Sequence, residues 1–210
     1  MSDSYSLSFR QARICRIAAA LFAAAALVRA VSVATSISLA ATPALEVKCG
    51  QAGCHAIERP ELLLPEKERA AIVARPAAMM RLAAYAHRPA VRAGIAAINV
   101  AQAAPFVLLM LCVAAATWRL GARGVDDLTR ALPWLRRASL AALAAAIVPP
   151  LADSLRTMLV LPGTPGGASW YFAIDLGPFM MELLLAFAAF IVSWALAAGN
   201  RARRDMAEFV

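Results

Sequence analysis

Apolar residues gather in four long runs along this chain, and most charged residues lie between these runs or at the two ends. The runs are rich in Ala, Leu, Val and Ile, and they cover about 17–40, 93–118, 138–161 and 171–198. About 20 residues of α-helix cross a hydrocarbon core, so each run is long enough for one span. No segment alternates apolar and polar residues as the strands of a membrane barrel do. The pattern therefore predicts an all-α, integral membrane four-helix bundle in which 1–210 form a single membrane domain.

The first connection between runs, about 41–92, is the longest and is predicted to extend outside the membrane. Four prolines divide it: Pro60, Pro65, Pro76 and Pro89. Apolar residues recur at helical spacing between these prolines, which predicts two short amphipathic helices. Their apolar side chains are expected to face the lipid or to cap the spans: Met79, Met80, Leu82 and Tyr85. A docking face for an extracytoplasmic partner is the alternative.

The composition excludes an ordinary soluble domain. Hydrophobic side chains make up 62% of the 210 residues, charged side chains make up only 16%, and the mean hydropathy is +0.67. A net charge of +8 would indicate nucleic-acid binding in a soluble protein, but in a membrane protein the placement of Lys and Arg is more informative. The predicted partner is therefore the lipid bilayer, without direct binding of nucleic acid.

Basic residues are concentrated at both ends of the chain and in the short connection about 119–137. These arginines are Arg10, Arg13, Arg16, Arg119, Arg123, Arg130, Arg136, Arg137, Arg201, Arg203 and Arg204. Short cytoplasmic segments carry such an excess, whereas long segments are translocated with little regard to charge. The chain is thus predicted to be a multi-pass protein of the bacterial inner membrane, with both termini in the cytoplasm and 41–92 outside.

The N-terminal run has a second interpretation. The basic residues at 10–16, the apolar stretch after them and the small residues at 38–41 could form a cleaved signal peptide. The apolar stretch continues well past Arg29, and it is longer than the usual core of a signal peptide. This length favours a retained first span.

The stretch 48–60, KCGQAGCHAIERP, places Cys49 and Cys54 five positions apart, with His55 directly after them. In the predicted topology both cysteines face an oxidising compartment, where a disulfide can form, whereas the other two cysteines of the chain do not. Such a short closed loop constrains the unfolded chain by about 2 kcal/mol, so it pins the loop locally and does not hold the fold. A disulfide between Cys49 and Cys54 is therefore predicted.

Two other interpretations of this stretch stay open. The sequence CGQAGCH resembles a widened form of the C-x-x-C-H haem-attachment motif, with His55 as one axial ligand and His87, Met79 or Met80 as the other. A zinc site would need adjacent Cys54 and His55 to reach one metal ion, which is a strained arrangement. On the disulfide interpretation the chain binds no metal and no cofactor.

Five charged residues interrupt the apolar runs, where an unpaired charge costs several kcal/mol. They are Arg29, Asp153, Arg156, Asp175 and Glu182. Counted from the outer end of each run, Arg29 and Glu182 are about 16 Å deep, whereas Arg156 and Asp175 are about 6 to 8 Å deep. Equal depths predict the ion pairs Arg29–Glu182 and Arg156–Asp175, with Asp153 in reach of Arg156 at i,i+3.

This predicted buried charge network has a structural and a functional interpretation. Asn99 and Gln102 share one face of the second span, and Asp175 and Glu182 share one face of the fourth, so a polar seam is expected. Such a seam would fix the packing of the helices, together with small alanines that allow close approach. A proton or ion relay that uses Glu182 or Asp153 is the alternative, although no pair of interrupted helices marks a transporter site.

The connection 119–137 carries Val125, Leu128, Leu132 and Leu135 at helical spacing, which predicts a short amphipathic helix on the membrane surface. Arginines of this connection and of the C-terminal tail form a predicted cytoplasmic basic surface: Arg136, Arg137, Arg201, Arg203 and Arg204. Such a surface binds anionic lipid headgroups or serves as a platform for a cytoplasmic protein.

From the second span onward the chain resembles a known family. A basic amphipathic connection ends in LRRASLAALAAAIVPPL, and the last span closes as SWALAAGNRARRDMAEFV. These features are similar to the bacterial membrane family catalogued as domain of unknown function 2975, although an aromatic residue expected near Gly124 is absent. The resemblance implies four helices, an extended first outer connection, no known catalytic activity and an association with small helix-turn-helix regulators.

The residues predict a protein that is not an enzyme, because the chain has no Ser/His/Asp set, no phosphate-cradling Gly-rich loop and no carboxylate pair in a water-exposed cleft. The first hypothesis is a regulatory or scaffolding subunit that binds a partner through its cytoplasmic basic surface. The alternatives are a small proton-coupled transporter that uses the Arg/Glu/Asp network and a haem-bearing redox subunit that uses Cys49, Cys54 and His55.

Overall fold

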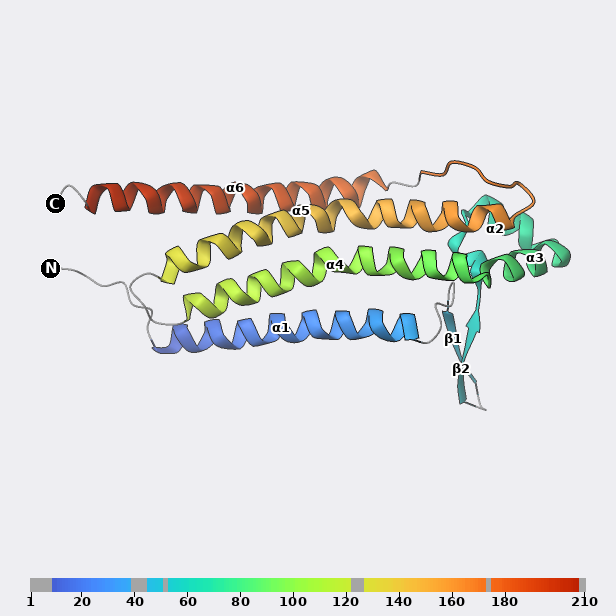
Figure 1. The fold of residues 1–210 in the computed structure, drawn as a ribbon, viewed down its shortest axis with the longest axis horizontal. Helices are drawn as coiled ribbons and strands as arrows, with labels where there is room; N and C mark the ends of the chain where they lie inside the picture. Colours follow the sequence, from blue (N-terminus) through green and yellow to red (C-terminus); the bar gives the residue numbers. More distant parts are fainter. Residues whose placement is uncertain (1–8, 39–44, 51–52, 122–126, 173–174, 208–210) are drawn as a thin grey trace. The chain divides into compact units, whose positions relative to one another are not determined.

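The computed structural model describes residues 9–38, 45–50, 53–121, 127–172 and 175–207 (Figure 1). Its four long helices are α1 (Phe9–Ser38), α4 (Pro89–Leu120), α5 (Asp127–Val160) and α6 (Leu176–Ala207). The first connection holds β1 (Leu45–Gly50), β2 (Gly53–Glu58), the 3-10 helix η1 (Pro60–Leu63), α2 (Glu66–Val73) and α3 (Pro76–Ala86). A second 3-10 helix, η2 (Leu161–Gly163), directly follows α5. In the strands and at some helix ends only the backbone is described, so the following side chains lie outside the described residues: Cys49, Cys54, His55, Arg201, Arg203 and Arg204.

All four long helices are long and apolar enough to cross a membrane. The stretches that meet this condition are Arg10–Thr35, Pro89–Leu120, Thr129–Gly163 and Leu176–Gly199. They overlap the four predicted runs, so the prediction of an all-α protein with four candidate membrane spans is confirmed. A helix suits this role because every backbone N–H and C=O group inside a bilayer must be paired within the protein.

The chain divides into two compact units. Unit 1 holds Met1–Val31, Ala103–Val148 and Leu176–Val210, and unit 2 holds Ser32–Gln102 and Pro149–Asp175. Helices α1, α4 and α5 run from one unit into the other, whereas α2 and α3 belong wholly to unit 2 and α6 belongs wholly to unit 1. The prediction of one membrane domain over 1–210 stays a prediction.

In unit 1, helix α1 packs through small residues. Ala12, Ala19 and Ala26 are buried and, at a spacing of seven residues, share one face of α1. At Gly121, directly after α4, an added Cβ atom would lie 3.1 Å from the carbonyl oxygen of Ala12, so a side chain there would push the two helices apart. Such close approach drives helix association in lipid, where the hydrophobic effect between helices is absent.

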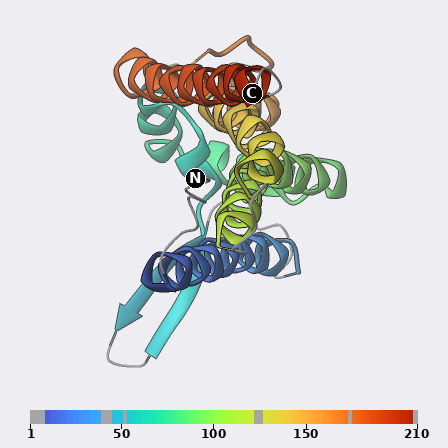
Figure 2. The same cartoon turned by 90° about the vertical axis from the view of Figure 1, so that its left-hand side faces the viewer.

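Two contacts in unit 1 link α4 to α5 and α5 to α6. The guanidinium of Arg119 in α4 lies 5.4 Å from the ring centroid of Trp134 in α5. The Ser193 hydroxyl of α6 is 3.5 Å from that of Ser139 in α5. Within unit 1, α4 and α5 lie between α1 and α6 (Figure 2).

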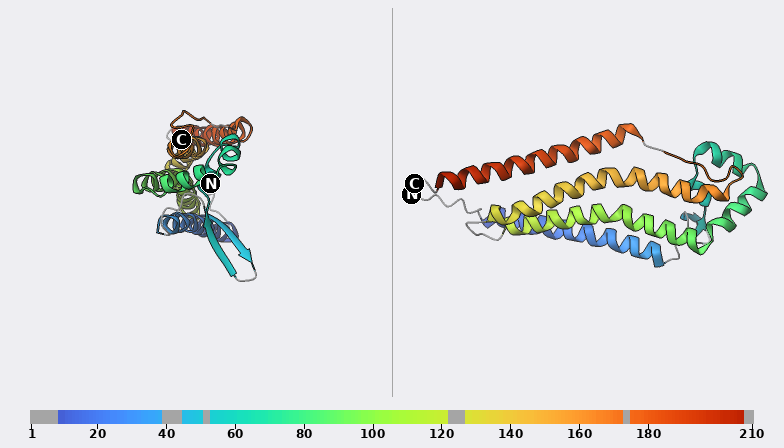
Figure 3. Two further views of the ribbon diagram at one scale, coloured as in Figure 1. Left: turned by 90° about the vertical axis from the view of Figure 1, so that its right-hand side faces the viewer. Right: turned by 45° about the horizontal axis from the view of Figure 1, so that its top comes forward.

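The core of unit 2 joins the first connection to the ends of α4 and α5. Ile72 of α2 and Leu82 of α3 are buried, and they belong to one apolar cluster with Val91 of α4 and Val160 of α5. The short helices of unit 2 lie at these ends of α4 and α5 (Figure 3). The first connection is therefore a folded cap on two of the candidate spans.

The prolines of the first connection set where its helices begin. Pro60 and Pro76 stand in the first turn of η1 and α3, where a missing N–H group breaks no helical hydrogen bond. Pro65 is the residue that precedes α2. The two predicted short helices are thus present as α2 and α3, with η1 before them.

Strands β1 and β2 form an antiparallel hairpin that the hydrophobic pattern did not lead us to expect. Their register places Cys49 opposite Cys54 and Gly50 opposite Gly53. Directly opposed residues of an antiparallel pair have Cα atoms about 4.5 or 5.5 Å apart, and both separations lie within the range of about 4.4 to 6.8 Å that a disulfide spans. The backbone of the hairpin therefore suits a bond between these two cysteines.

The separate amphipathic helix expected within 119–137 is not present as such. Its apolar residues Leu132 and Leu135 belong to α5, which begins at Asp127 and continues without a break to Val160. The short connection is reduced to the few residues between α4 and α5. Pro133 does not interrupt the helix, because prolines are tolerated in membrane helices when neighbouring groups pair the freed carbonyl.

The cap leads to a stability prediction. Leu82 is fully buried, whereas Met80 on the same helix is 69% exposed. We expect Leu82→Ala to lower the free energy of unfolding of unit 2 by about 2–5 kcal/mol, because it leaves a cavity in the core. Met80→Ala is the matched control and should change it by less than about 0.5 kcal/mol. Hydrogen exchange of the backbone amides of 60–95 in detergent measures both effects, and equal protection in the two variants would contradict the assignment of the core.

Candidate functional site

The guanidinium of Arg156 is the centre of a polar cluster between α4 and α5 in unit 2. Its Nε donates to Asn99 Oδ1 at 3.0 Å, its Nη1 donates to Asp153 Oδ1 at 2.6 Å, and its Nη2 donates to Gln102 Oε1. The side chain of Arg156 is only 17% exposed. Asn99 and Gln102 come from α4, and Asp153 and Arg156 come from α5, so one cation joins the two helices.

The next residue extends the same cluster to the cap. Thr157 Oγ1 is 3.0 Å from the backbone carbonyl oxygen of Leu63 in η1 and 3.1 Å from that of Asp153. One turn earlier, Ser154 Oγ donates to the carbonyl oxygen of Pro150 at 2.8 Å. Hydrogen bonds of this kind satisfy polar groups that lipid cannot satisfy, so the cluster fixes α4, α5 and η1 in one arrangement.

The contacts within this cluster agree with the predicted reach of Asp153 and with the shared face of Asn99 and Gln102. Asp153, expected as a spare carboxylate within reach, is the ion-pair partner that the structure gives to Arg156. Asn99 and Gln102 share one face as expected, and this face meets Arg156. The pair Arg156–Asp175 stays a prediction.

The other charges of the apolar runs are not covered by protein, and their place inside a bilayer stays a prediction. Arg29, Asp175 and Glu182 are exposed, and the Asp153 side chain is 59% exposed. In the described part of the chain, no ion pair joins Arg29 to Glu182. Within unit 1, α1 and α6 lie on opposite sides of α4 and α5 (Figure 2).

Counted from the helix ends, the depths of Arg29 and Glu182 are not equal. Helix α6 begins at Leu176, so Glu182 is about 9 Å from that end, whereas Arg29 is about 14 Å from the end of α1 at Ser38. Asp175 precedes α6, which begins at Leu176, so Asp175 and Glu182 do not share a helix face.

Unit 1 carries a cluster of arginines around Trp134 of α5. The guanidinium of Arg137 lies 4.9 Å from the ring centroid of Trp134, and Arg119 approaches the same ring. Arg130 and Arg136 are exposed on the same helix as Trp134. Among the described residues none of these four arginines has a carboxylate partner. The aromatic ring holds two of the cations in place without neutralising them.

A groove of about 1040 Å³ lies beside this cluster, between α5 and α6. Apolar side chains make up most of its wall, and two arginines stand among them. The lining residues that matter here are Leu132, Leu140, Phe190, Trp194, Arg136 and Arg137. We refer to this feature as the basic groove. The predicted cytoplasmic basic surface is thus described at Arg136 and Arg137, while its three tail arginines lie outside the described side chains.

The residues named for the haem and metal alternatives do not gather in the described part of the structure. His87 is exposed at the end of α3, Met80 is exposed, and Met79 packs against the apolar core of unit 2. No group of three or more His, Cys, Asp or Glu side chains that could hold a metal ion is found among the described residues. The side chains of Cys49, Cys54 and His55 lie outside them.

Two features of these sites went unnoticed in the sequence. Trp134 stands directly between arginines in RALPWLRR, a pattern that favours cation–π contacts on a helix. Phe190, Trp194 and Ala197 follow one another at i, i+4 and i+7, so they share a face of α6. The arginines on both sides of Trp134 could have indicated the arginine cluster from the sequence alone. The face of Phe190, Trp194 and Ala197 forms a groove only against α5, so the sequence of α6 could not indicate it.

Comparisons with known proteins add no assignment. No protein-family model matches the chain, and neither a curated protein nor a solved structure matches it. The resemblance to domain of unknown function 2975 therefore stays a prediction.

The Arg156 cluster can be tested by removing its cation. We expect Arg156→Leu to lower the free energy of unfolding by about 1–3 kcal/mol, because the Asp153 carboxylate and two amide oxygens lose their donor. Arg29→Leu is the control, since it removes the same charge from an exposed position and should not destabilise the protein. Thermal unfolding of the purified protein in detergent compares the two variants. Equal losses would contradict a specific role for Arg156.

Proposed function

We propose that this chain is a regulatory or scaffolding subunit of the bacterial inner membrane, which binds a partner protein in the basic groove at the cytoplasmic face. The four candidate spans support a multi-pass membrane protein. The arginines near both termini and in the sequence between the second and third runs are in excess over other short segments, and this excess supports cytoplasmic termini. No catalytic step is part of the proposal.

The basic groove is the observation that carries this function. Leu140 and Trp194 offer an apolar wall that fits the apolar face of an amphipathic helix. Arg136 and Arg137 stand in the same wall and fit acidic side chains at the border of that face. The occupant is therefore an acidic amphipathic helix of a partner protein. A small helix-turn-helix regulator is the partner class that the family resemblance implies. Such a partner would bind DNA itself, and this chain would not.

Charge reversal tests the groove. In the double variant Arg136→Glu/Arg137→Glu, the amount of a specific companion protein that co-purifies from native membranes should fall about tenfold or more, because attraction becomes repulsion. The apolar-wall variant Trp194→Ala should weaken recovery of the same companion. Quantitative mass spectrometry of the purified samples measures both.

The control for this experiment is Arg10→Glu/Arg16→Glu, which reverses two exposed arginines of α1 that do not line the groove. It should leave recovery of the companion unchanged. Equal loss in the control would indicate general attraction to basic residues and contradict the proposal. Phospholipid in the groove without any companion sensitive to these substitutions would contradict it as well.

The disulfide between Cys49 and Cys54 belongs to the same proposal, since it marks the hairpin as extracytoplasmic. The register that places the two cysteines opposite each other supports it. The other two cysteines, Cys15 and Cys112, are free. A structural disulfide forms and persists outside the cytoplasm, so its presence would orient the first connection.

Counting free thiols tests this part. The chain has four cysteines, so the denatured and unreduced protein should take up two alkylating groups, and the reduced protein should take up four. In Cys49→Ser/Cys54→Ser the number should be two under both conditions. Uptake of four groups by the unreduced protein would rule out the bond. Mass spectrometry of the intact chain gives these numbers directly.

A further inference from the structure

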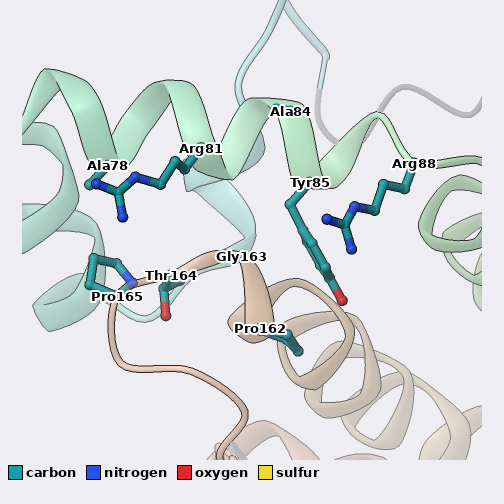
Figure 4. A pocket seen from close by; sticks show the side chains of 9 residues that line it. All are labelled: Ala78, Arg81, Ala84, Tyr85, Arg88, Pro162, Gly163, Thr164 and Pro165. Carbon is teal, nitrogen blue, oxygen red and sulfur yellow. The ribbon is translucent and has the colours of Figure 1, made fainter.

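A cavity of about 400 Å³ lies in unit 2 between α3 and the segment 162–165 (Figure 4). Arg81, Tyr85 and Arg88 line one side of it, and Gly163 and Thr164 line the other. Figure 4 shows the Tyr85 side chain extending from α3 toward Pro162 and Gly163, with Arg88 beside its ring and Arg81 nearer Ala78. The cavity belongs to the capped end of unit 2 and has no residue in common with the basic groove.

The walls of this cavity are held in place by direct contacts. A Cβ atom added to Gly163 would lie 2.8 Å from Cδ1 of Tyr85, so the ring rests on the glycine backbone. The guanidinium of Arg88 lies 4.9 Å from the centroid of the same ring. The Thr164 hydroxyl donates to the carbonyl oxygen of Leu161 at 2.8 Å. Contacts within the protein therefore hold the walls of the cavity.

The lining has the chemistry of an anion site. Two guanidinium groups and a phenol hydroxyl can donate hydrogen bonds into the cavity, and no Asp or Glu lines it. In the part of the chain that the structure describes, neither Arg81 nor Arg88 has a carboxylate partner. Arg88 contacts Tyr85 through a cation–π interaction, which uses the face of the aromatic ring and not the N–H groups of the arginine. These N–H groups therefore stay available for an anion.

The cavity lies where two candidate spans end. Arg88 directly precedes Pro89, the first residue of one span, and Gly163 is the last residue of another. Helix α4 has 32 residues and is about 48 Å long, so it extends beyond a hydrocarbon core of about 30 Å into the headgroup region. Arg88 thus lies directly at a span end, where a helix of this length can reach the phosphate groups of phospholipids.

We propose that this cavity binds a phosphate group, with Arg81 and Arg88 as its cationic ligands and the Tyr85 hydroxyl as a third donor. Arginine suits phosphate because its planar fork of N–H groups matches two phosphate oxygens. A phospholipid headgroup and a soluble phosphate ester share this chemistry, and the experiment below separates them. The proposal concerns a cavity of unit 2 and does not rest on the function proposed for the basic groove.

Native mass spectrometry of the full chain in detergent tests the site. The probes are dioleoyl phosphatidylglycerol and dioleoylglycerol, which has the same acyl chains but no phosphate. The unmodified protein should retain phosphatidylglycerol and not dioleoylglycerol. In Arg81→Gln/Arg88→Gln, retention of phosphatidylglycerol should fall about tenfold or more, because each charge-assisted hydrogen bond contributes an effect of that order.

The matched control is Lys67→Gln/Arg75→Gln, which removes two exposed charges of the same cap that do not line the cavity. It should retain phosphatidylglycerol as the unmodified protein does. Equal loss in both double variants, or full retention in Arg81→Gln/Arg88→Gln, would exclude a phospholipid headgroup as the ligand of this cavity. Arg81→Lys/Arg88→Lys keeps the charge and loses the planar fork, so its retention should be intermediate, and circular dichroism verifies that each variant is folded.

Inorganic phosphate separates the two sources of the ligand. If a phospholipid is the ligand, phosphate should displace phosphatidylglycerol from the unmodified protein only in large excess. If a soluble phosphate ester is the ligand, inorganic phosphate should raise the unfolding temperature of the unmodified protein and not of Arg81→Gln/Arg88→Gln, while phosphatidylglycerol has no selective effect. Absence of both responses would exclude a phosphate site in this cavity.

Discussion

An arginine inside an apolar helix must find its hydrogen-bond acceptors within the protein, because lipid supplies none. Arg156 meets this requirement in unit 2 by binding Asp153 on its own helix and two amide oxygens on α4. The packing of the cap depends on the same arrangement. Thr157 follows Arg156 and contacts the carbonyl of Leu63, so the position of α5 relative to α4 also sets the position of η1. A cation that would be costly alone thus determines how three elements of unit 2 meet.

The chain uses its other arginines differently. Arg119, Arg136 and Arg137 have no carboxylate partner among the described residues, and Trp134 orients two of them. A cation held against an aromatic ring is positioned, yet it keeps its charge for an outside ligand. The pair Arg81 and Arg88 repeats this principle in unit 2 beside Tyr85. Arg156 therefore joins two helices, whereas the arginines beside Trp134 and Tyr85 keep their charge for an outside ligand.

Much of the fold could be predicted from the sequence, because a membrane span requires a continuous apolar run and a proline favours the first turn of a helix. The four apolar runs predicted four helices, and Pro60 and Pro76 marked the starts of η1 and α3. The depth of the charged residues in the membrane was predicted less accurately, because hydropathy does not locate the helix ends from which depth is counted. The partners of Arg156 are 57 and 54 positions away, and only the packed helices bring them together. The hairpin did carry a signal, since Leu45, Val47 and Cys49 alternate with Glu46 and Lys48, but five residues of alternation are easily overlooked beside four spans.

The long sequence separation inside the unit 2 core imposes an order on biosynthesis. Ile72 and Leu82 are made early, whereas Val160 and Leu161, which complete their apolar cluster, belong to the end of α5. The hydrogen bond from Thr157 to Leu63 joins residues 94 positions apart. The first connection therefore leaves the ribosome well before it can bury its apolar side chains. Until α5 is inserted, these side chains must rest on the membrane surface or on a chaperone, and a ribosome that stalls before α5 would leave the cap open to proteolysis.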